Sequence, residues 1–396
     1  MKKLNSKALD YHAFPQPGKL SVSSSKTCDT AEDLSLAYTP GVAEPVLEIV
    51  KDPKNAYRFT NKGNLVAVIT NGTAVLGLGN TGALASKPVM EGKGVLFKRF
   101  ADIDVYDIEI DCEDPDEFIQ TVVNISPTFG GINLEDIAAP ECFYIESELK
   151  KRLSIPVFHD DQHGTAVIVA AGLINALEIQ QKLIEKVKIV FLGAGAAGCS
   201  CARLLKLMGA TDITMVDSKG ILSNDRKNLN QYNQDLAIDT KGKTFNDAIQ
   251  HADVFIGVSG ANLLKDEHVK SMSKKPIIFA LANPDPEMLP SEAHAIRDDI
   301  VMATGRSDFD NQVNNVLGFP FLFKGALEAK AKQINTDMLI AAANALALLA
   351  KEPVPQSVLE AYDVAELNFG PNYIIPKPFD PRLIDWVAKA VKEAYK

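Results

Sequence analysis

Short apolar runs alternate with helical stretches along the second half of the chain. Helical patterns such as Cys199–Met208 and Thr244–Gln250 lie between several of these runs. This alternation predicts a parallel, doubly wound sheet, because strands that run parallel to one another are usually joined by crossover helices. The predicted strands are Lys188–Leu192, Ile213–Val216, Val254–Val258, Ile277–Leu281 and Ile300–Met302.

The first half has a different pattern, which predicts a mixed α/β unit. The apolar run Leu65–Thr70 is followed by Asn71-Gly72 and by a second apolar run, Ala74–Leu78. Asn-Gly favours the two-residue turns of β-hairpins, so we expect this sheet to be at least partly antiparallel. Ile103–Ile110 alternates apolar and polar positions and predicts a further strand.

The change of pattern near Ser154–Pro156 predicts a boundary between two domains. The chain has 396 residues, and a domain typically has roughly 100–200 residues. We expect a substrate domain over residues 1–154 and a Rossmann-like cofactor domain over residues 155–396, with the boundary before the helix Thr165–Ile179. The proline-rich tail after Pro353 should pack back over one of the two.

Composition and charge narrow the classes of function. The net charge of −10 argues against a broad nucleic-acid footprint, which needs clustered Lys and Arg. The most apolar helical stretches, Ala166–Ile174 and Met338–Ala350, are shorter than the ~20 residues that span a membrane. The polar start, Met1–Asp10, does not resemble a signal peptide. The five cysteines contain no CxxC pair and are expected to be reduced thiols in a cytoplasmic protein: Cys28, Cys112, Cys142, Cys199 and Cys201.

A glycine-rich turn predicts a dinucleotide site in the second half. Gly193-Ala194-Gly195-Ala196-Ala197-Gly198 directly follows the strand Lys188–Leu192 and opens a helix. The first glycine permits a tight turn, the second lets the backbone approach a pyrophosphate, and the third lets helix and strand pack closely. The N–H groups at the start of the helix would then face the phosphates. Asp217 ends the next strand, where its carboxylate could accept hydrogen bonds from the adenosine ribose.

A second glycine motif, Gly77-Leu78-Gly79-Asn80-Thr81-Gly82, has a weaker context. It follows the predicted hairpin, and Pro88 should interrupt the helix after it, because proline lacks an N–H and clashes inside a helix. We interpret the motif as a backbone turn near the site that could face substrate. Asn283 follows one of the later strands, where the nicotinamide end of a cofactor should lie, although an ordinary turn residue before proline would show the same pattern.

Two pairs of adjacent carboxylates are candidates for a metal site. Glu135-Asp136 follows the glycine-rich turn Gly130–Asn133, and Asp160-Asp161 follows the apolar run Ile155–Phe158. Carboxylates crowded at strand ends are costly unless a cation offsets their charge, and oxygen ligands suit Mg²⁺ or Mn²⁺. Solvated loop acids or a helix cap are the alternative interpretation. His159 and His163 have the spacing of a zinc protease but straddle a turn between a strand and a helix, so zinc is not expected.

Five stretches together resemble the malic enzyme family, in the family's order and over nearly the whole chain. The similarity is to the bacterial type whose longer members carry a phosphotransacetylase-like extension, which we expect this chain, ending at Lys396, to lack. The matching stretches are Leu36–Ala43, Pro88–Lys93, Gly130–Ile137, Phe158–Ala166 and Asn311–Val316.

The resemblance implies a divalent-metal-dependent oxidative decarboxylation of L-malate to pyruvate and CO2, with reduction of NAD or NADP. Decarboxylation of oxaloacetate would be a further activity. Lys93 would remove the hydroxyl proton of malate, and Tyr38 would protonate C3 of the enol. The other implied roles are metal ligation by Glu135, Asp136 and Asp161, support of these ligands by Asp160, substrate and cofactor contacts by Asn283 and Asn315, and a cofactor contact by Thr165.

One departure from the family concerns the carboxylate of malate. Animal and plant members carry an arginine at the position that aligns with Ala74, so we expect backbone amides around Gly77–Gly82 to bind this carboxylate instead. Cofactor choice stays open: Asp217 would repel a 2′-phosphate and favours NAD, whereas Ser218-Lys219 could bind the phosphate and favours NADP. NADP is slightly preferred. The resemblance also implies a homodimer.

Two other functions agree less well with these residues. A dehydrogenase of another small acid, such as an amino acid, has no use for three metal-binding carboxylates. A catalytically silent, nucleotide-sensing relative would not need Tyr38 and Lys93 together with all three acids.

Overall fold

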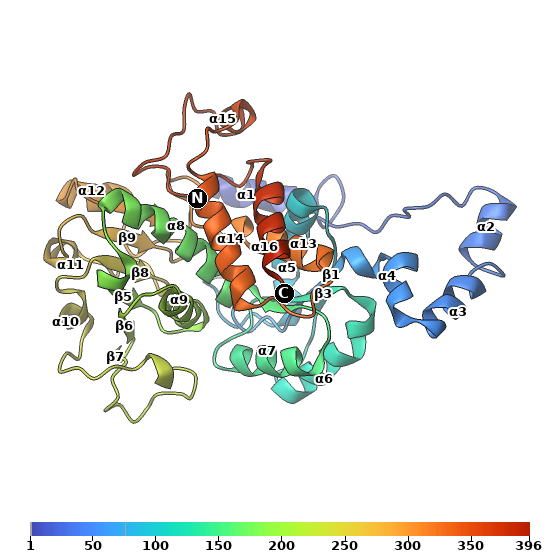
Figure 1. Ribbon diagram of the computed structural model, residues 1–396, viewed down its shortest axis with the longest axis horizontal. Helices are drawn as coiled ribbons and strands as arrows, with labels where there is room; N and C mark the ends of the chain where they lie inside the picture. The colour runs from blue at the N-terminus through green and yellow to red at the C-terminus, as the bar shows by residue number, and fades with distance from the viewer. Residues whose placement is uncertain (1, 76) are drawn as a thin grey trace.

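Two β-sheets organise the chain, which the computed structural model describes over residues 2–75 and 77–396 (Figure 1). The first sheet has four strands in the order β2-β1-β3-β4, and the second has six in the order β10-β9-β8-β5-β6-β7. Helices pack around both sheets, so the predicted α/β class with a Rossmann-like second half is confirmed.

The first sheet is parallel throughout. Its strands are β1 (Leu65–Thr70), β2 (Asp104–Glu109), β3 (Gly131–Leu134) and β4 (Val157–His159).

The predicted hairpin is therefore wrong. After Thr70 the chain enters a loop that runs to Gly82, where Val75 and Gly79 form an isolated antiparallel bridge. Leu76, inside the predicted second strand, lies outside the described residues. All six residues of β1 are buried, which is typical of a parallel strand covered on both faces rather than of a hairpin with one wet face.

The predicted interruption at Pro88 is also wrong, because α5 (Ala83–Ala101) continues through it. The helix loses the bond that residue 88 would have donated to the Leu84 carbonyl. Leu84 is 85% exposed, so water can solvate this first turn. The carbonyl of Pro88 itself accepts a hydrogen bond from Lys19 Nζ at 2.5 Å. The unbroken helix carries Lys93 in its interior.

The second sheet has the predicted doubly wound form. Strand β7 (Gly220–Ile221) is antiparallel to β6, and the other strands are parallel. Strand order reverses between β5 and β8, and ligands of such sheets bind beyond the carboxyl ends of the strands at this point. The parallel strands are β5 (Lys188–Leu192), β6 (Asp212–Asp217), β8 (Val254–Gly257), β9 (Ile277–Ala280) and β10 (Val301–Thr304).

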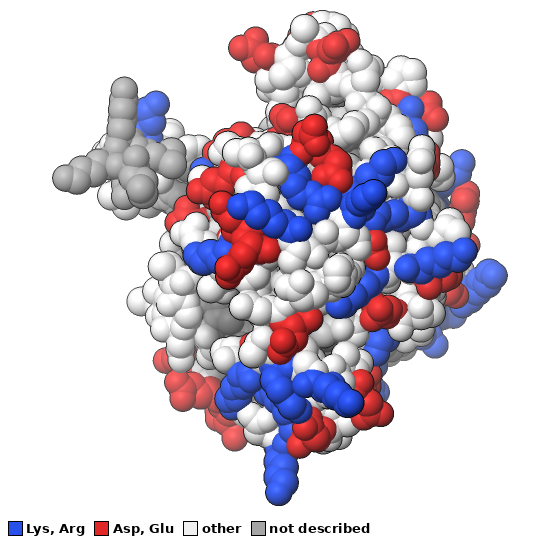
Figure 2. Space-filling model, turned by 90° about the vertical axis from the view of Figure 1, so that its left-hand side faces the viewer, with Lys and Arg blue, Asp and Glu red and all other residues white. Residues whose placement is uncertain are grey.

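Helices of the second half surround this sheet (Figure 1). The central one, α8 (Thr165–Gln180), is buried along most of its length. On the outward face of this half, basic and acidic side chains are interspersed (Figure 2), so recognition of an anion there depends on local clusters. The remaining helices of the layer are α9 (Ala196–Leu207), α10 (Phe245–Ile249), α11 (Asp266–Ser271) and α12 (Pro290–Ile296).

Helices from the end of the chain return to the first sheet. Phe319 and Phe323 on α13 (Phe319–Glu328) make edge contacts with Phe97 on α5, at centroid distances of 4.8 and 5.3 Å. The tail helix α16 (Lys389–Ala394) packs on α13 and on α14 (Thr336–Leu349). Earlier in the tail, the Ile374 carbonyl accepts from Asn175 on α8 at 2.8 Å, so the tail contacts both halves and not one of them as predicted. The first sheet also continues past residue 154 through β4. A domain boundary near residue 154 remains a prediction from the sequence. In the structure, residues of both halves contribute to one hydrophobic core.

The N-terminal segment is arranged in two parts. Helix α1 (Lys2–Ala13) lies against the body, and residues 21–60 project from it at the right of Figure 1. We call residues 21–60 the arm; it contains α2 (Ala31–Ala37), α3 (Ala43–Lys51) and α4 (Ala56–Phe59). Helices α6 (Pro115–Ile125) and α7 (Glu141–Arg152) lie beside the first sheet, and α15 (Gln356–Tyr362) stands at the top of the view. Within the described residues, no helix combines the length and apolarity needed to cross a membrane.

Candidate active site

Lys93 points from α5 into a group of carboxylates that follow two neighbouring strands. Its Nζ lies 2.8 Å from Glu135 Oε1 and 2.8 Å from Asp160 Oδ2. Glu135 follows β3 and Asp160 follows β4, and these strands are parallel neighbours, so the topology brings both carboxylates to one edge of the sheet. The Lys93 ammonium also lies 4.4 Å from the ring centroid of Phe319, a cation–π contact from α13.

The charges in this group do not balance. Burial opposes the charge on Lys93, but Asp160 and Glu135 outweigh it and raise the pKa of the lysine above its ordinary value. Burial raises the pKa of the Glu135 carboxyl well above its usual range; Lys93 opposes this effect, and Asp161, Asp160 and Asp136 add to it. One lysine among four carboxylates leaves an excess of negative charge that would attract a further cation.

Three of the carboxylates could hold that cation. Glu135, Asp136 and Asp161 each offer one oxygen, and these oxygens all lie within 4.8 Å of one another. The Asp136 N–H donates to Asp161 Oδ2 at 2.9 Å, which ties the two loops together. The donors are hard oxygens with no sulfur or nitrogen, so the residues present fit Mg²⁺ or Mn²⁺.

Two buried side chains that the sequence interpretation missed orient this trio. Asn133 Nδ2 donates to Glu135 Oε2 at 2.9 Å, and His159 Nε2 lies 3.2 Å from Asp161 Oδ2. Asn133 lies in β3 and Glu135 directly after it. Side chains two positions apart in a strand point to the same face of the sheet, so this spacing could have predicted the contact.

Glu146, also missed, organises the turn at residues 160–164. Its carboxylate accepts from the His159 N–H and from Gln162 Nε2, both at 3.2 Å, and contacts His163 Nε2 at 2.8 Å. Burial would raise the pKa of Glu146, but His163 and Lys150 lower it overall. The imidazole rings of the two histidines thus contact different carboxylates, Asp161 for His159 and Glu146 for His163. Glu146 could have been found from the sequence, because it is an acid on the face of α7 that is otherwise apolar and buried.

A chain of side-chain contacts extends from Lys93 toward the second half. Asn315 Nδ2 donates to Asp160 Oδ2 at 3.0 Å, and Thr165 Oγ1 donates to Asn315 Oδ1 at 3.2 Å. A Cβ on Gly164 would lie 1.9 Å from Asp160 Oδ1, so only glycine fits beside this carboxylate. The structure therefore brings together four of the residues predicted to act in one site.

The first glycine motif forms a turn of the expected kind between β5 and α9. A Cβ on Gly198 would lie 2.0 Å from the Gly193 carbonyl oxygen, whereas a Cβ on Gly195 would meet no atom within 4 Å. Close helix packing thus requires Gly198, and the space at Gly195 is open to a ligand. Ala194, Ala196 and Ala197 complete the turn. Ser200 Oγ on α9 lies 3.4 Å from His163 Nδ1, which connects this helix to the carboxylate turn.

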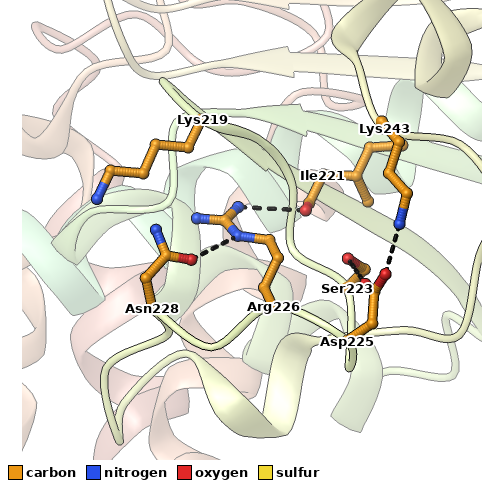
Figure 3. Close-up of a pocket in the computed structure, with 7 residues that line it drawn as sticks. All are labelled: Lys219, Ile221, Ser223, Asp225, Arg226, Asn228 and Lys243. Atoms are coloured by element: carbon orange, nitrogen blue, oxygen red, sulfur yellow. Dashed lines mark hydrogen bonds and ion pairs between the residues drawn. The ribbon is translucent and has the colours of Figure 1, made fainter.

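Asp217 is held by an arginine that the sequence interpretation did not include. Arg226 binds both carboxylate oxygens, at 2.9 and 2.8 Å, and the Lys219 N–H donates to Oδ1 at 2.8 Å. Burial would raise the pKa of Asp217, but the Arg226 contact lowers it overall. Next to Ser218 and Lys219 a cleft of about 240 Å³ opens (Figure 3). Its lining residues are Lys219, Ile221, Ser223, Asp225, Arg226, Asn228 and Lys243.

The second glycine motif lies between the two halves of the site. A Cβ on Gly77 would be 3.0 Å from the Asn283 carbonyl oxygen, and the Ala74 N–H donates to the Asp136 carbonyl at 3.0 Å. The motif thus borders both the carboxylates and the cofactor half. The N–H groups of Leu78, Thr81 and Gly82 donate within the loop, so these three amides cannot bind the malate carboxylate as expected without breaking loop hydrogen bonds.

A buried acid, Glu287, positions the loops that follow β8 and β9. It accepts from the Ser259 N–H at 3.0 Å and from the Ala282 N–H at 3.1 Å, and it is fully shielded from solvent. Asn283 comes directly after Ala282, and its side chain packs against Gly305, where a Cβ would lie 2.9 Å from Asn283 Nδ2.

Of the two predicted catalytic residues, Lys93 lies in this group and Tyr38 does not. Tyr38 caps the end of α2 on the arm, and its side chain is 70% exposed. Figure 1 shows α2 well separated from α5, which carries Lys93, and from β3, which leads to Glu135.

Comparisons with known proteins give a consistent result. The family model described as malic enzyme, N-terminal domain, matches residues 17–150, and the model described as malic enzyme, NAD binding domain, matches residues 162–363. An NADP-dependent malic enzyme of Halomonas elongata is 59% identical over 98% of this chain and 92% of its own length. An NADP-dependent malic enzyme of Escherichia coli is 56% identical over 99% of this chain, which spans only 52% of that relative. The crystal structure of malic enzyme from Pyrococcus horikoshii Ot3 matches with a TM-score of 0.90 at 43% identity, covering 98% of this chain and 90% of that one.

Proposed function

The chain belongs to the malic enzyme family, and from this premise we infer that it oxidises and decarboxylates L-malate to pyruvate and CO2 while reducing NAD(P). One observation carries the placement of this chemistry: a buried lysine contacts one member of a trio of carboxylates whose oxygens lie within 4.8 Å of one another. Neither another small-acid dehydrogenase nor a silent relative needs that arrangement.

We propose Glu135, Asp136 and Asp161 as the ligands of Mg²⁺ or Mn²⁺, and the crevice beyond β5 and β8 as the cofactor site. A bound cation supplies Lewis acidity toward the substrate oxygens, and bound NAD(P) supplies the hydride acceptor. Asn133 and His159 hold two of the three carboxylates, so the trio is preorganised before substrate enters.

Lys93 is proposed to take the proton from the C2 hydroxyl of malate as the C2 hydrogen leaves as hydride. Asp160 holds the lysine ammonium, and Asn315 in turn donates to Asp160. Burial of Lys93 keeps water away from the proton that it receives. The facing carboxylates favour the ammonium form of Lys93. A cation bound to Glu135 would offset the negative charge of that carboxylate. Glu135 would then raise the pKa of Lys93 less than it does without the cation.

Loss of CO2 leaves electrons at C3, where a proton must return to give pyruvate. Tyr38 is the proposed donor of that proton. Asn283 and Asn315 are proposed to contact the substrate and the nicotinamide ribose, and Thr165 the cofactor, since Thr165 and Asn315 are hydrogen-bonded to each other beside Asp160. Oxaloacetate is a proposed second substrate at the same site, because its decarboxylation needs no preceding oxidation.

For the cofactor, we propose a preference for NADP. The repulsion expected from Asp217 is offset because Arg226 forms a two-point ion pair with it. Lys219, Arg226 and Lys243 line the adjacent cleft, where a 2′-phosphate would meet basic groups (Figure 3). Asp225, which pairs with Lys243 at 2.6 Å, is the one acid among the lining residues.

One assay tests the reaction. Reduction of NADP and of NAD would be followed spectroscopically with L-malate and Mn²⁺, before and after EDTA, with pyruvate measured enzymatically. We expect pyruvate in proportion to reduced cofactor, and loss of activity with EDTA that added Mn²⁺ restores. Metal-independent reduction, or oxaloacetate as the sole product, would show that the proposal is incorrect.

We further propose a cytoplasmic homodimer. The five cysteines are free thiols, which supports a reducing compartment. The exposed apolar surface of the arm supports self-association.

A further inference from the structure

A carboxylate is buried at the carboxyl ends of the central strands of the second sheet. Glu287 is fully shielded from solvent. Its side chain fills the space beside Gly257, the last residue of β8, where a Cβ would lie only 2.4 Å from Glu287 Cδ. Ligands of doubly wound sheets bind beyond these strand ends, at the point where strand order reverses. Glu287 is therefore placed to act on the proposed cofactor site without forming part of its surface.

Main-chain N–H groups hold both oxygens of this carboxylate. Oε1 accepts from the Ser259 N–H at 3.0 Å, and Oε2 accepts from the Ala282 N–H at 3.1 Å. An ionised carboxylate offers acceptors on both oxygens, as these two contacts require. Burial raises the pKa of Glu287, and the N–H groups of Ser259, Ala282 and Gly260 oppose this shift. The contacts thus help to keep a charge on Glu287 in a place that solvent does not reach.

In the part of the chain that the structure describes, no lysine, arginine or histidine forms an ion pair with Glu287. Arg306 on the loop after β10 pairs with Asp308 at 2.7 Å instead and lies 3.5 Å from Asp285. Water and salt screen a buried charge much less than an exposed one. Glu287 therefore contributes a fixed negative potential at this end of the sheet.

Two exposed residues lie next to the groups that Glu287 holds. Ser259 follows β8, and its own N–H is one of those groups. Asn283 directly follows Ala282 after β9 and is the residue proposed to contact the nicotinamide ribose. The tips of both loops are open to a ligand, while the acid that joins them is closed to solvent. A ligand held at these tips would therefore experience the field of a weakly screened charge.

We propose that Glu287 sets the balance between the two oxidation states of the cofactor, favouring the binding of NAD(P)⁺ and the release of NAD(P)H. The nicotinamide ring is positively charged when oxidised and neutral once it has accepted a hydride with its electron pair. A fixed negative charge at this end of the sheet attracts the first form and has much less effect on the second. The inference rests on the proposed function, because it takes the crevice beyond β5 and β8 as the cofactor site. A positioning residue that only holds the two loops is the competing interpretation.

Binding of both cofactor forms tests the inference, without malate so that no turnover occurs. Isothermal titration calorimetry measures Kd for NADP⁺ and for NADPH with the wild type and with Glu287→Gln, which keeps the size of the side chain and removes its charge. The ratio of Kd for NADP⁺ to Kd for NADPH should rise on the order of 10-fold, as a unit charge produces in a medium with an effective dielectric constant of about 20. A ratio within ~2-fold of the wild-type value would overturn the inference.

Two further variants separate the charge from the structure of the loops. Glu287→Asp keeps the charge close to its place, so the ratio should stay within ~3-fold of the wild-type value even if both affinities fall. Glu292→Gln removes an exposed acid from the start of α12, where glutamine can still accept from the Leu289 N–H, and should leave the ratio unchanged. If Glu287→Gln weakens both cofactor forms by the same factor, Glu287 only holds the loops and the inference fails.

Main-chain hydrogen bonds should preserve the loops in Glu287→Gln. The Asn262 N–H donates to the Pro286 carbonyl at 3.0 Å, and the Leu264 N–H donates to the Glu287 carbonyl at 3.1 Å. If circular dichroism nevertheless shows an unfolded variant, the wild type supplies a second measurement. Its ratio should change by less than ~2-fold between about 0.05 and about 0.5 M KCl, because salt hardly screens a buried charge. A change of ~5-fold or more would assign the effect to surface charges and contradict the inference.

The same titrations distinguish the two proposals. If the wild type binds neither NADP⁺ and NADPH nor NAD⁺ and NADH, the proposed cofactor site fails, and the inference fails with it. If the wild type binds both oxidation states and the ratio does not respond to Glu287→Gln, the inference alone fails and the proposed function stands.

Discussion

The ammonium group of Lys93 lies 2.8 Å from Asp160 Oδ2, and the Asp160 side chain is fully buried. Asp160 therefore directs its carboxylate to the lysine, whereas its neighbour Asp161 directs its own to the carboxylate trio. Two adjacent acids of the same type thus have separate tasks, because the turn at residues 160–164 sends their side chains in different directions. This separation can be tested one residue at a time.

Asp160→Asn should slow the reaction without weakening metal binding. The amide keeps the shape of the side chain but removes the charge that holds Lys93 beside Glu135. We expect kcat to fall by about 10–100-fold, with a change of less than ~3-fold in the dissociation constant for Mn²⁺. Steady-state kinetics and Mn²⁺ titration by electron paramagnetic resonance measure the two quantities. Equal losses in both would mean that Asp160 is a ligand.

Asp161→Asn should have the opposite profile. It removes one charged oxygen from the trio and weakens the contact with His159. Mn²⁺ should bind at least ~10–100-fold more weakly in the same titration, which needs no turnover. Unchanged Mn²⁺ affinity would remove Asp161 from the proposed ligand set.

Arg226→Gln should change the choice of cofactor. It removes a positive charge from the cleft and leaves the charge of Asp217 unopposed, so a 2′-phosphate would be repelled. We expect KM for NADP to rise by about 10–100-fold, with a change of less than ~3-fold for NAD. Lys227→Gln, at an exposed neighbour that does not line the cleft, is the matched control. If both cofactors are affected equally, Arg226 supports the fold of this loop rather than selecting NADP.

Glu109→Gln should alter how stability depends on pH. Burial and the neighbouring Asp107 raise the pKa of Glu109 to about 7, while Lys87 opposes this shift. An acid with a raised pKa in the folded state holds its proton there at pH values where the unfolded chain has lost it. The contribution of Glu109 to the free energy of unfolding should therefore decrease as pH rises from about 4.5 to about 7.

The glutamine variant should lack this decrease and be more stable at pH 8 by an amount on the order of 1 kcal/mol. Urea unfolding at several pH values measures the difference. Parallel pH profiles for the two proteins would contradict the expectation. Glu91 also faces Lys87, at 3.9 Å, so Glu91→Gln controls for a general change in this charge group.

Features that depend on local chemistry could be predicted from the order of the residues alone. The five parallel strands of the second sheet and the turn at Gly193–Gly198 were predicted from apolar periodicity and from the glycine spacing that a strand–turn–helix unit requires. The family, and with it the reaction, followed from motifs that the chain carries intact. The proximity of Glu135, Asp136 and Asp161 agrees with the predicted ligand set, whose role the Asp161 variant tests.

Features that depend on partners distant along the chain could not be predicted in this way. Asn71-Gly72 is a good hairpin turn, but burial of both faces of β1 gave the strand parallel neighbours instead. Arg226 offsets the negative charge of Asp217, and no local sequence pattern predicts this ion pair. The exposure of Tyr38 is likewise invisible in its motif, because a sequence records which residues are present and only packing determines which surfaces remain uncovered.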